Sequence, residues 1–422
     1  MPTPGGEGSL SDYGYDVLIV GGAIMGSSVA MALAERSPSL SVAVIDPDLE
    51  GGLSSTLKNA GGVRAMWRNR SNVSLCSFSI DYYRSVADEV QYRELGYFWL
   101  HGERTLREVE AGMGLYAEYG LGVEIHPPGD VAHILPFVDS LDGVSGISVA
   151  RKAGLIDHYS LREHYRRRAR EAGAVFFDRT VAGAIEMAGG RVRAVRAVVL
   201  EGESADRQAG RYLLNGALPD SARKVCFGCR VLVNATGAWT PRVSALYGFD
   251  DRHVKPRRRQ MVVLDCPALD LSRWGMIIDT SDVYFHQDGP FVVAGYSNMD
   301  EPYGYNMDYT FGGAEPESPF VRYIWTPLWK RISRFESVRV VRGWAGLYAE
   351  TPDRSGYLGR VPGTKNVYES VAHTGRGVMI SYGAGQALAD LIVDGSLRPE
   401  LGWAAALARS RPSGPQIEEL HL

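Results

Sequence analysis

Hydrophobic and polar positions along this chain of 422 residues follow two different patterns. The first is an apolar run at Val17–Val20, a glycine turn, a helical segment and a second apolar run at Val42–Ile45 that ends on Asp46. A continuous run of four apolar residues is typical of a parallel strand that is buried on both faces. This order of strand, turn, helix and strand predicts a Rossmann-type βαβ unit.

The second pattern occupies residues 241–340. Short segments of alternating polarity are separated by turn residues, which predicts an antiparallel sheet rather than further βαβ units. The strands expected there are 260–264, 275–278, 283–286 and 291–296. Elsewhere the periodicity predicts helices at 72–95, 105–118, 160–173 and 381–393, and a strand at 97–102.

Three polar segments suggest surface features. Ser160 and Glu163 have the spacing of a capping box, and we interpret the arginines of this helix as its solvated outer face, with a basic patch as the alternative. These arginines are Arg162, Arg166, Arg167, Arg168 and Arg170. We interpret residues 201–224 as an inserted surface loop. We interpret Lys255–Arg259 as an exposed sheet edge defended by charge, with a surface facing an acidic substrate as the alternative.

The glycine turn after the first strand carries candidate chemistry. Gly21 and Gly22 allow a sharp turn and a close approach to a pyrophosphate, while Gly26 allows the helix to pack against the strand. Asp46 lies 20 residues after Gly26, where such units place the acid that binds ribose hydroxyls. Ala23 replaces the middle glycine of the fingerprint and adds a methyl group near the phosphates. The set predicts a dinucleotide site, with a purely structural βαβ unit as the alternative.

Composition limits the class of protein and its partners. The net charge of −4 and the scattered basic residues indicate no nucleic acid or anionic membrane as partner. No apolar stretch reaches the ~18 residues of a transmembrane helix. Residues 1–15 lack the basic start and apolar core of a signal peptide, so we expect a flexible lead and a cytoplasmic protein.

The four cysteines do not form a disulfide framework in a chain of this length. Cys226 and Cys229 have the spacing of half a zinc site or of a redox pair. The chain has no second pair to complete a metal site, and an apolar strand follows directly. We therefore expect no metal and interpret these residues as two strand cysteines.

Six separated segments together are similar to a known family. They are DVLIVGGAIMG, STLKNAGGVR, GLIDHYSLREHYRRRAREAGAVFF, VLVNATGAW, WAGLYAETPD and AHTGRGVMISYGAGQALADLIVDG, which span residues 16–395. In this order they resemble the FAD-dependent amine and amino-acid oxidoreductases of the D-amino-acid oxidase superfamily, especially the glycine, sarcosine and opine oxidase-like branch. Context of this kind makes a glycine fingerprint specific.

The resemblance implies an α/β fold. It contains a glutathione-reductase-type FAD-binding Rossmann domain and an α+β substrate domain with a mostly antiparallel sheet. The FAD domain would comprise residues 16–96, 150–240 and 341–422, and the substrate domain residues 97–149 and 241–340.

The resemblance also implies which residues bind FAD. From the pyrophosphate to the pyrimidine edge of the flavin they are Gly21, Gly22, Ala23, Ile24, Gly26, Asp46, Ser54, Ser55, Thr56, Asn59, Gly61, Gly62, Val63, Val181, Ala235, Thr236, Gly237, Trp239, Gly375, Arg376, Gly377, Val378 and Met379. Val181 would meet the adenine through its backbone. We expect non-covalent FAD, because the cysteine that many relatives use near Tyr348 is absent and the early loop has no histidine.

The implied chemistry is oxidation of a carbon–nitrogen bond, by hydride transfer to flavin N5 followed by imine hydrolysis. The substrate would be a secondary or primary amine, more specifically an N-substituted amino acid, and the electron acceptor would be oxygen or an unidentified acceptor. The candidate catalytic residues are Arg64, His286, Tyr348 and Arg376, with Arg259 as a further candidate cation. A structural role is the alternative for His286.

One departure from the family keeps other functions open. Sarcosine oxidases have a carboxylate-binding lysine where this chain has Met379. This departure leaves a non-catalytic flavin-bound assembly protein as an alternative. A second alternative is an FAD-dependent hydroxylase, which has a similar FAD domain and uses NAD(P)H.

Overall fold

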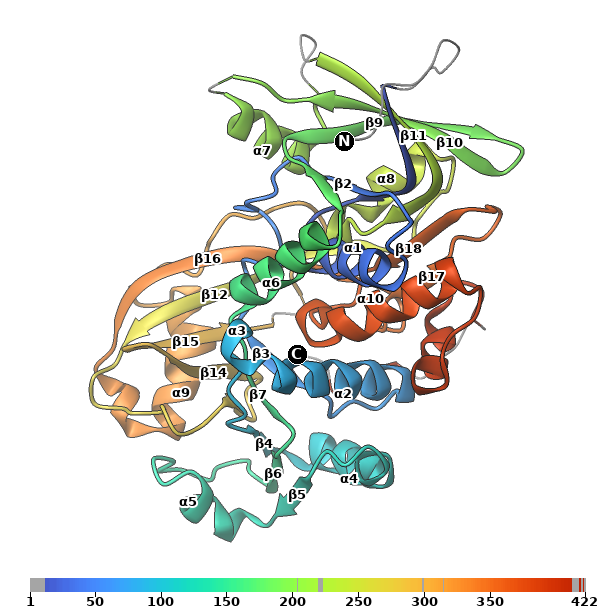
Figure 1. The fold of residues 1–422 in the computed structure, drawn as a ribbon. Helices are drawn as coiled ribbons and strands as arrows, with labels where there is room; N and C mark the ends of the chain where they lie inside the picture. Colours follow the sequence, from blue (N-terminus) through green and yellow to red (C-terminus); the bar gives the residue numbers. More distant parts are fainter. Residues whose placement is uncertain are drawn as a thin grey trace.

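The computed structural model describes residues 12–202, 204–218, 223–297, 300–313, 315–411, 417, 418 and 420. In these residues the chain forms two eight-stranded sheets and one two-stranded sheet. Helices pack beside and between the two large sheets (Figure 1).

The first large sheet contains the predicted βαβ unit. Its strands are β1 (Tyr13–Val20), β2 (Val42–Ile45), β8 (Val175–Phe177), β9 (Thr180–Ala188), β10 (Arg191–Val199), β11 (Arg223–Asn234), β17 (Tyr357–Arg360) and β18 (Val367–Val371). The order is β17-β18-β11-β1-β2-β8, and β10 and β9 extend from β11. Strand β1 pairs in parallel with both β11 and β2, as the buried apolar run predicts.

Four helices pack against one another on one side of this sheet. They are α1 (Ile24–Arg36), α2 (Arg70–Ser85), α6 (His158–Glu171) and α10 (Gly377–Val393). Helix α1 packs against both α6 and α10, and α10 packs against α2 (Figure 1). Residues 24–34 of α1 are all buried, because small and apolar side chains alone fit between a sheet and two helices.

The second large sheet lies on the other side of the helices. Its strands are β4 (Tyr97–His101), β5 (Val123–His126), β6 (Gly146–Ala150), β12 (Lys255–Asp265), β13 (Met276–Ile278), β14 (Val283–Asp288), β15 (Phe291–Tyr296) and β16 (Arg339–Glu350). The order is β16-β12-β15-β14-β13-β4-β6-β5. All neighbouring pairs are antiparallel except β13 with β4, so the expected mostly antiparallel sheet is confirmed.

The remaining elements are short or connect the sheets. Strands β3 (Gly62–Arg64) and β7 (Ala153–Leu155) form the two-stranded sheet, and the other α-helices are α3 (Ala87–Val90), α4 (Glu103–Glu118), α5 (Val131–Ile134), α7 (Ala205–Asn215), α8 (Thr240–Leu246) and α9 (Thr326–Arg331). Segments of other helix types occur at Pro128–Asp130, Gly237–Trp239, Val321–Trp325, Ser333–Glu336 and Pro399–Leu407. Within the described part of the chain, no helix combines the length and apolarity needed to cross a membrane.

Several expected boundaries need correction. Of the expected lead, residues 1–11 lie outside the described residues, and β1 already begins at Tyr13. The helix expected at 72–95 ends at Ser85 and is followed by the short α3. Strand β16 pairs with β12 in the second sheet, although we assigned residues 341–422 to the FAD domain. The division of the chain into two domains otherwise stays a prediction.

The interpretation of α6 is wrong in two respects. Its N-cap is Asp157, whose carboxylate accepts a hydrogen bond from the backbone N–H of Ser160 at 2.5 Å. Arg162 and Arg166 are buried rather than exposed, with 0% and 1% relative accessibility. They lie one turn apart on the side of α6 that packs against α1, so helix periodicity places them inside.

Residues 201–224 are not a surface loop. They contain α7, whose buried positions Ala205, Ala209 and Leu213 recur at helical spacing. The start of β11 belongs to the same segment, and this strand also carries Cys226 and Cys229 as free cysteines. The interpretation of these two as strand cysteines is confirmed.

Lys255–Arg259 is not a sheet edge. These residues open β12 and pair with β16 on one side, while on the other side Arg257 forms an isolated bridge with Tyr303 and β15 pairs only from Gln260 onward. Arg257 and Arg259 are buried, and both lie within ion-pair distance of the Glu350 carboxylate. A carboxylate on the neighbouring strand thus replaces the solvent that we expected around this charge run.

Candidate functional site

The glycine turn after β1 is shaped by close backbone contacts. Gly21 has a φ of +102°, and a Cβ there would lie 2.7 Å from the carbonyl oxygen of Ala235. A Cβ at Gly26 would lie 1.8 Å from the carbonyl oxygen of Gly21. Both positions therefore require glycine, and they bring the first turn of α1 against the end of β1.

The N-terminus of α1 opens into a large cavity without a capping side chain. Ala23 is the N-cap residue, and the first turn contains no acid. The N–H of Ile24 donates to Thr56 Oγ1 at 3.2 Å, while the neighbouring first-turn N–H groups have no partner in the helix. Ala23 and Ile24 line the cavity. This end of α1 can therefore bind an anion such as a pyrophosphate.

Asp46 lies at the end of β2, beside the same cavity. Its carboxylate accepts hydrogen bonds from the backbone N–H of Gly22 at 2.6 Å and of Asp48 at 2.8 Å. Burial raises the pKa of Asp46 to about 6, against the opposing effect of these N–H groups and of Arg166. The ionised carboxylate can accept two hydrogen bonds from ribose hydroxyls.

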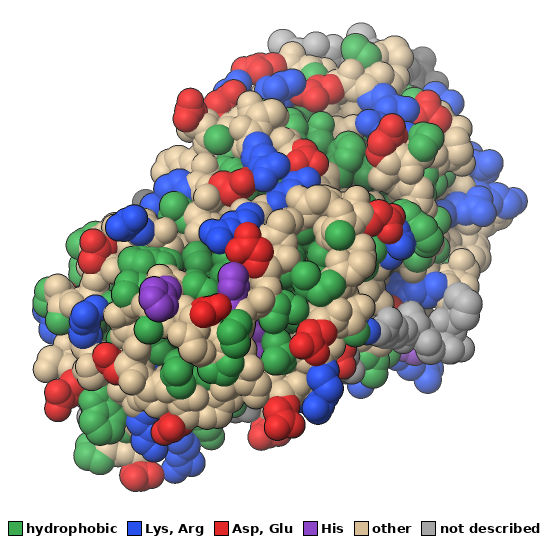
Figure 2. All heavy atoms as spheres, turned by 90° about the horizontal axis from the view of Figure 1, so that it is seen from below, with side chains coloured by type: hydrophobic (Ala, Val, Ile, Leu, Met, Phe, Trp, Pro, Cys, Tyr) green, Lys and Arg blue, Asp and Glu red, His purple; other side chains and the backbone are tan. Residues whose placement is uncertain are grey.

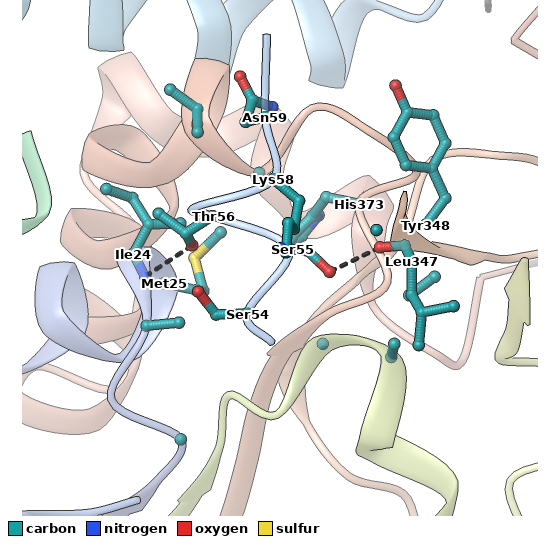
Figure 3. Close-up of a pocket in the computed structure, with 18 of the residues that line it drawn as sticks. Ile24, Met25, Ser54, Ser55, Thr56, Lys58, Asn59, Leu347, Tyr348 and His373 are labelled. Carbon is teal, nitrogen blue, oxygen red and sulfur yellow. Dashed lines mark hydrogen bonds between the residues drawn. The ribbon is translucent and has the colours of Figure 1, made fainter. Parts of the chain in front are cut away.

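A loop from Ser54 to Asn59 runs between helix α1 and strand β16 (Figure 3). Ser55 donates to the carbonyl oxygen of Leu347 on β16 at 2.6 Å, and Thr56 accepts from α1. In Figure 3, Ile24 lies on one side of this loop and Leu347 on the other. The loop therefore ties the βαβ unit to the second sheet and lines the cavity between them.

A second helix N-terminus reaches the same cavity. Gly375 has a φ of +77°, and a Cβ there would lie 2.6 Å from the ring of Tyr348. Helix α10 then begins at Gly377 with no side-chain cap and no acid in its first turn. A partly positive helix end at this place stabilises negative charge on a bound ring system.

These features fit FAD. One cavity combines two uncapped helix N-termini, a carboxylate placed for ribose hydroxyls and a glycine turn that admits a close backbone approach. Pyrophosphate, ribose and a ring that gains negative charge on reduction are the matching parts of this cofactor.

Most of the predicted cofactor residues line the cavity. They are Gly21, Ala23, Ile24, Asp46, Ser54, Ser55, Thr56, Asn59, Gly62, Val181, Ala235, Thr236, Gly237, Trp239, Gly375, Gly377, Val378 and Met379. The predicted cofactor residues that do not line it are Gly22, Gly26, Gly61, Val63 and Arg376. Gly22, for example, holds the Asp46 carboxylate through its N–H.

The part of the cavity beside the second sheet has a basic group among aromatic and sulfur-containing side chains. The guanidinium of Arg259 lies 5.0 Å from the ring centroid of Tyr348 and donates to Glu350 Oε1 at 2.9 Å. The walls there also include Trp67, Tyr97, Met261, Met276 and Tyr284. Burial raises the pKa of Tyr284 and of Tyr348, so both hydroxyls stay protonated.

Two of the other predicted substrate residues do not line the cavity. The ring nitrogens of His286 lie 2.7 Å from the carbonyl oxygen of Ala60 and 3.0 Å from that of Gln287, which favours the structural alternative. Arg376 is fully buried beside Trp67, with its guanidinium 4.8 Å from the ring centroid. Burial lowers the pKa of both groups.

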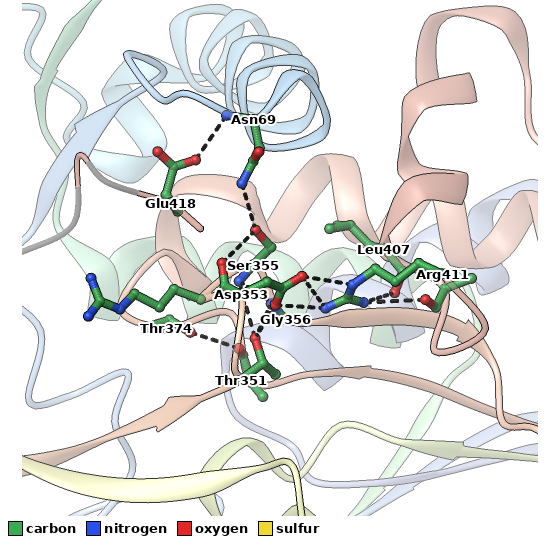
Figure 4. Close-up of polar contacts among 12 residues, drawn as sticks. Asn69, Thr351, Asp353, Ser355, Gly356, Thr374, Leu407, Arg411 and Glu418 are labelled. Carbon is green, nitrogen blue, oxygen red and sulfur yellow. Dashed lines mark hydrogen bonds and ion pairs between the residues drawn. The ribbon is translucent and has the colours of Figure 1, made fainter. Parts of the chain in front are cut away.

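Arg64 lines the cavity, but backbone carbonyls hold its guanidinium. Its terminal nitrogens donate to the carbonyl oxygens of Met66 and Leu420, the latter at 2.5 Å. The Glu418 carboxylate, two residues earlier in the tail, accepts from the backbone N–H of Asn69 at 3.1 Å (Figure 4). The C-terminal segment therefore forms the support behind this wall of the site.

Several cavity residues were missed from the sequence. Lys58, Trp67, Tyr97, Tyr212 and His373 line the cavity. Lys58 lies in the segment that we matched to the family, but nothing in its spacing marks it. Burial lowers the pKa of the Lys58 ammonium, and it lowers that of His373 to about 3, so this histidine is neutral. Tyr212 could have been found from the helical spacing of its neighbours in α7.

The face in Figure 2 carries acidic and basic side chains side by side. No extended surface of one sign is visible on that face, which fits an overall charge of only −4. The charged groups that matter for the cavity lie inside the molecule.

Comparisons with known proteins agree with this geometry. The family described as DAO, FAD dependent oxidoreductase, matches residues 16–391. FAD-dependent oxidoreductase domain-containing protein 1 of Xenopus laevis is 27% identical, with 93% of this chain and 81% of that protein covered. Glycine oxidase of Bacillus licheniformis is 23% identical, with 94% and 97% covered. The structure of L-proline dehydrogenase from P. horikoshii has a TM-score of 0.78 at 21% identity and covers 93% of this chain and 96% of its own.

Proposed function

Because the chain belongs to the DAO family of FAD-dependent oxidoreductases, we propose that it oxidises a carbon–nitrogen bond of a secondary or primary amine, and specifically of an N-substituted amino acid. Members of this family bind FAD, and amino-acid oxidases are among its relatives. The substrate and the reaction are our proposal.

The observation that carries this proposal is Arg259 at the cavity wall. Its guanidinium is buried on the face of β12 that bears Met261, opposite Gly346 on β16 and beside the ring of Tyr348. The guanidinium donates to Glu350 and to the carbonyl oxygen of Arg258, and because it carries five N–H groups it can also donate to a substrate carboxylate, a bond that burial strengthens. Arg259 would therefore hold the carboxylate of an amino acid at a fixed place beside the cofactor site.

The other walls suit the carbon chain and the amine. Tyr97, Met276 and Tyr284 present apolar surface that excludes water and favours a neutral amine over an ammonium ion. When bound, FAD supplies the hydride acceptor, and the resulting imine is hydrolysed by water. The chain binds the substrate and orients it toward the cofactor. The reaction then proceeds within one complex and does not depend on a random collision in the right orientation.

The names of two relatives support this substrate class. One is a glycine oxidase, and the other, similar in fold, is an L-proline dehydrogenase. Glycine is a primary amine and proline a secondary amine, and both carry the carboxylate that Arg259 would bind.

We further propose that FAD is held without a covalent bond. Cys76, Cys226, Cys229 and Cys266 are the cysteines of this chain, and none of them lines the cavity. Acid precipitation of the yellow protein should therefore release the flavin into the supernatant. Flavin that stays with the precipitate would contradict this part of the proposal.

The test of the function is the visible spectrum of the purified protein under anaerobic conditions. A panel of sarcosine, proline, other N-substituted amino acids, D-amino acids and opines is added, with the matching decarboxylated amines as controls. Bleaching of the flavin band by a carboxylated amine, and not by its decarboxylated partner, is expected. Admission of oxygen then distinguishes an oxidase from a dehydrogenase.

Two other outcomes would overturn the proposal. Bleaching by NAD(P)H alone would indicate a hydroxylase. A bound flavin that no amine and no nicotinamide reduces would indicate a non-catalytic assembly protein.

A further inference from the structure

Helix α7 covers the end of the cavity at which Asp46 lies. Tyr212 and Leu213, in the last turn of α7, line the cavity together with Thr180 and Val181 at the start of β9. A dinucleotide whose pyrophosphate meets α1 and whose ribose meets Asp46 brings its adenine to this end. The residues of α7 therefore lie on the adenosine side and not on the flavin side.

Helix α7 packs against the β9–β10 hairpin. Ala205 and Ala209 form a small buried cluster with Val181 and Leu200, and Tyr212 packs against this cluster. The spacing of 205, 209 and 212 places these three side chains on one face of α7. The same face thus joins the hairpin to the cavity.

The C-terminal end of α7 is fixed by a second group of contacts. Arg242 of α8 donates to the carbonyl oxygens of Tyr212, Leu213 and Leu214 at 2.7–2.9 Å. The indole N–H of Trp239, a cavity residue, donates to the same oxygen of Leu213 at 2.5 Å. A guanidinium at this end satisfies carbonyls that have no partner in the helix and opposes the negative end of its dipole.

We propose that α7 is a lid for the adenosine half of FAD, with Tyr212 as its contact residue, and that it lets this chain discriminate FAD from FMN. The aromatic ring offers a flat apolar face to a purine. Within the described part of the chain the Tyr212 hydroxyl makes no hydrogen bond, so it can bond to the ribose or to a ring nitrogen of the adenine.

The test compares three ligands on the apoprotein of the full chain. FAD contains both halves of the cofactor, ADP only the adenosine half and FMN only the flavin half. In Tyr212→Ala, we expect the Kd of FAD and of ADP to rise about tenfold, the effect of losing one aromatic contact to a base. The Kd of FMN should not change. Leu214→Ala is the matched control, because Leu214 belongs to the same turn and is 37% exposed.

Two results would overturn the proposal. One is an unchanged Kd for FAD and ADP in Tyr212→Ala. The other is an equal loss of affinity for all three ligands, which would show that α7 only supports the fold.

Amide hydrogen exchange of the unaltered protein tests the proposal without a variant. The amides of Ala205–Asn215 should exchange more slowly when FAD or ADP is bound and at the unchanged rate with FMN. Equal protection by FMN, or no protection by ADP, would contradict a lid over adenosine.

Discussion

The guanidinium of Arg166 donates to the carbonyl oxygen of Gly22 at 2.7 Å, inside the turn that opens the cofactor site. The same nitrogen donates to the carbonyl oxygen of Leu49 at 2.5 Å, and another donates to Glu163 at 2.9 Å. A buried arginine on α6 thus holds two backbone segments, those after β1 and β2, at a fixed separation. Arg166 is a positioning residue, because its bonds fix the turn and it does not line the cavity.

We expect Arg166→Met to weaken FAD binding tenfold or more and to lower the stability of the apoprotein by about 2–4 kcal/mol. The reason is that two buried carbonyls lose their donor. Fluorescence titration and denaturant unfolding measure the two effects. Arg167→Met is the matched control, since the neighbouring arginine is exposed. Equal behaviour of the two variants would contradict the positioning role.

FAD binding should depend on the ionisation of Asp46. Its pKa of about 6 means that the carboxylate becomes protonated below this pH and then accepts fewer hydrogen bonds from ribose. The affinity for FAD should therefore fall by up to about tenfold per pH unit below pH 6. Asp46→Asn should bind FAD more weakly at pH 8 and lack this pH dependence. A parallel pH dependence in both proteins would rule out Asp46 as the group responsible.

The stability of the apoprotein should show the opposite trend. The folded state holds the Asp46 proton more tightly than the unfolded chain does, because the folded pKa is raised. The contribution of Asp46 to stability is therefore lost as pH rises from about 4 to about 6. The difference in free energy of unfolding between the unaltered apoprotein and Asp46→Asn, measured across this range, isolates the effect of one carboxyl.

Gly26→Ala should disrupt the first turn of α1. The added Cβ would lie 1.8 Å from the carbonyl oxygen of Gly21, so the helix must shift away from β1. A loss of about 3 kcal/mol and of most FAD affinity is expected. Gly114→Ala in α4 is the control, because a Cβ there meets no atom within 4 Å. That change should leave FAD binding intact and raise stability by up to about 1 kcal/mol.

Ala23→Gly should leave FAD binding equal or tighter. The backbone of Ala23 has a φ of −71°, which any residue adopts, so the methyl group is not needed for the turn. Its removal only widens the approach to the pyrophosphate. Markedly weaker binding in a fluorescence titration would refute the argument from phosphate approach.

Arg259→Lys should raise the KM of a carboxylated amine about tenfold or more, with a smaller effect on kcat. The charge is retained, but the five N–H groups of the planar guanidinium are lost. Arg258→Lys is the matched control, because Arg258 is the preceding residue of β12 and pairs with Glu301 on the opposite face. An unchanged KM in Arg259→Lys would remove Arg259 from the substrate site.

The parts of the fold that local sequence determines could be predicted. Gly21, Gly26 and Asp46 lie within one βαβ unit, in which spacing along the chain sets spacing in space. The alternating strands of the second sheet were also correctly placed, because burial on one face leaves a period of two in the sequence. The segments around Ser54 and Gly375 were assigned to the site from the family resemblance and not from periodicity.

The remaining features depend on contacts between distant segments. Arg166 and Arg259 look like solvated charges in the sequence, and they are buried only because α6 packs on α1 and Glu350 lies on the strand beside β12. His286 was predicted from a strand expected to face the flavin and Arg376 from the cofactor-contacting glycine before it, but neither lines the cavity. A charged side chain gives no sign in the sequence of the partner that permits its burial.

The hydrogen bond from Arg64 to the carbonyl oxygen of Leu420 has a consequence for biosynthesis. The cavity begins to form at Gly21, but the support of its Arg64 wall comes from Leu420, which is made much later. A ribosome that adds 5–20 residues per second needs about 20–80 s to travel between these two points. Through that interval the nascent chain has a glycine turn without a finished pocket, so we expect cofactor capture only after the segment around Leu420 has been made.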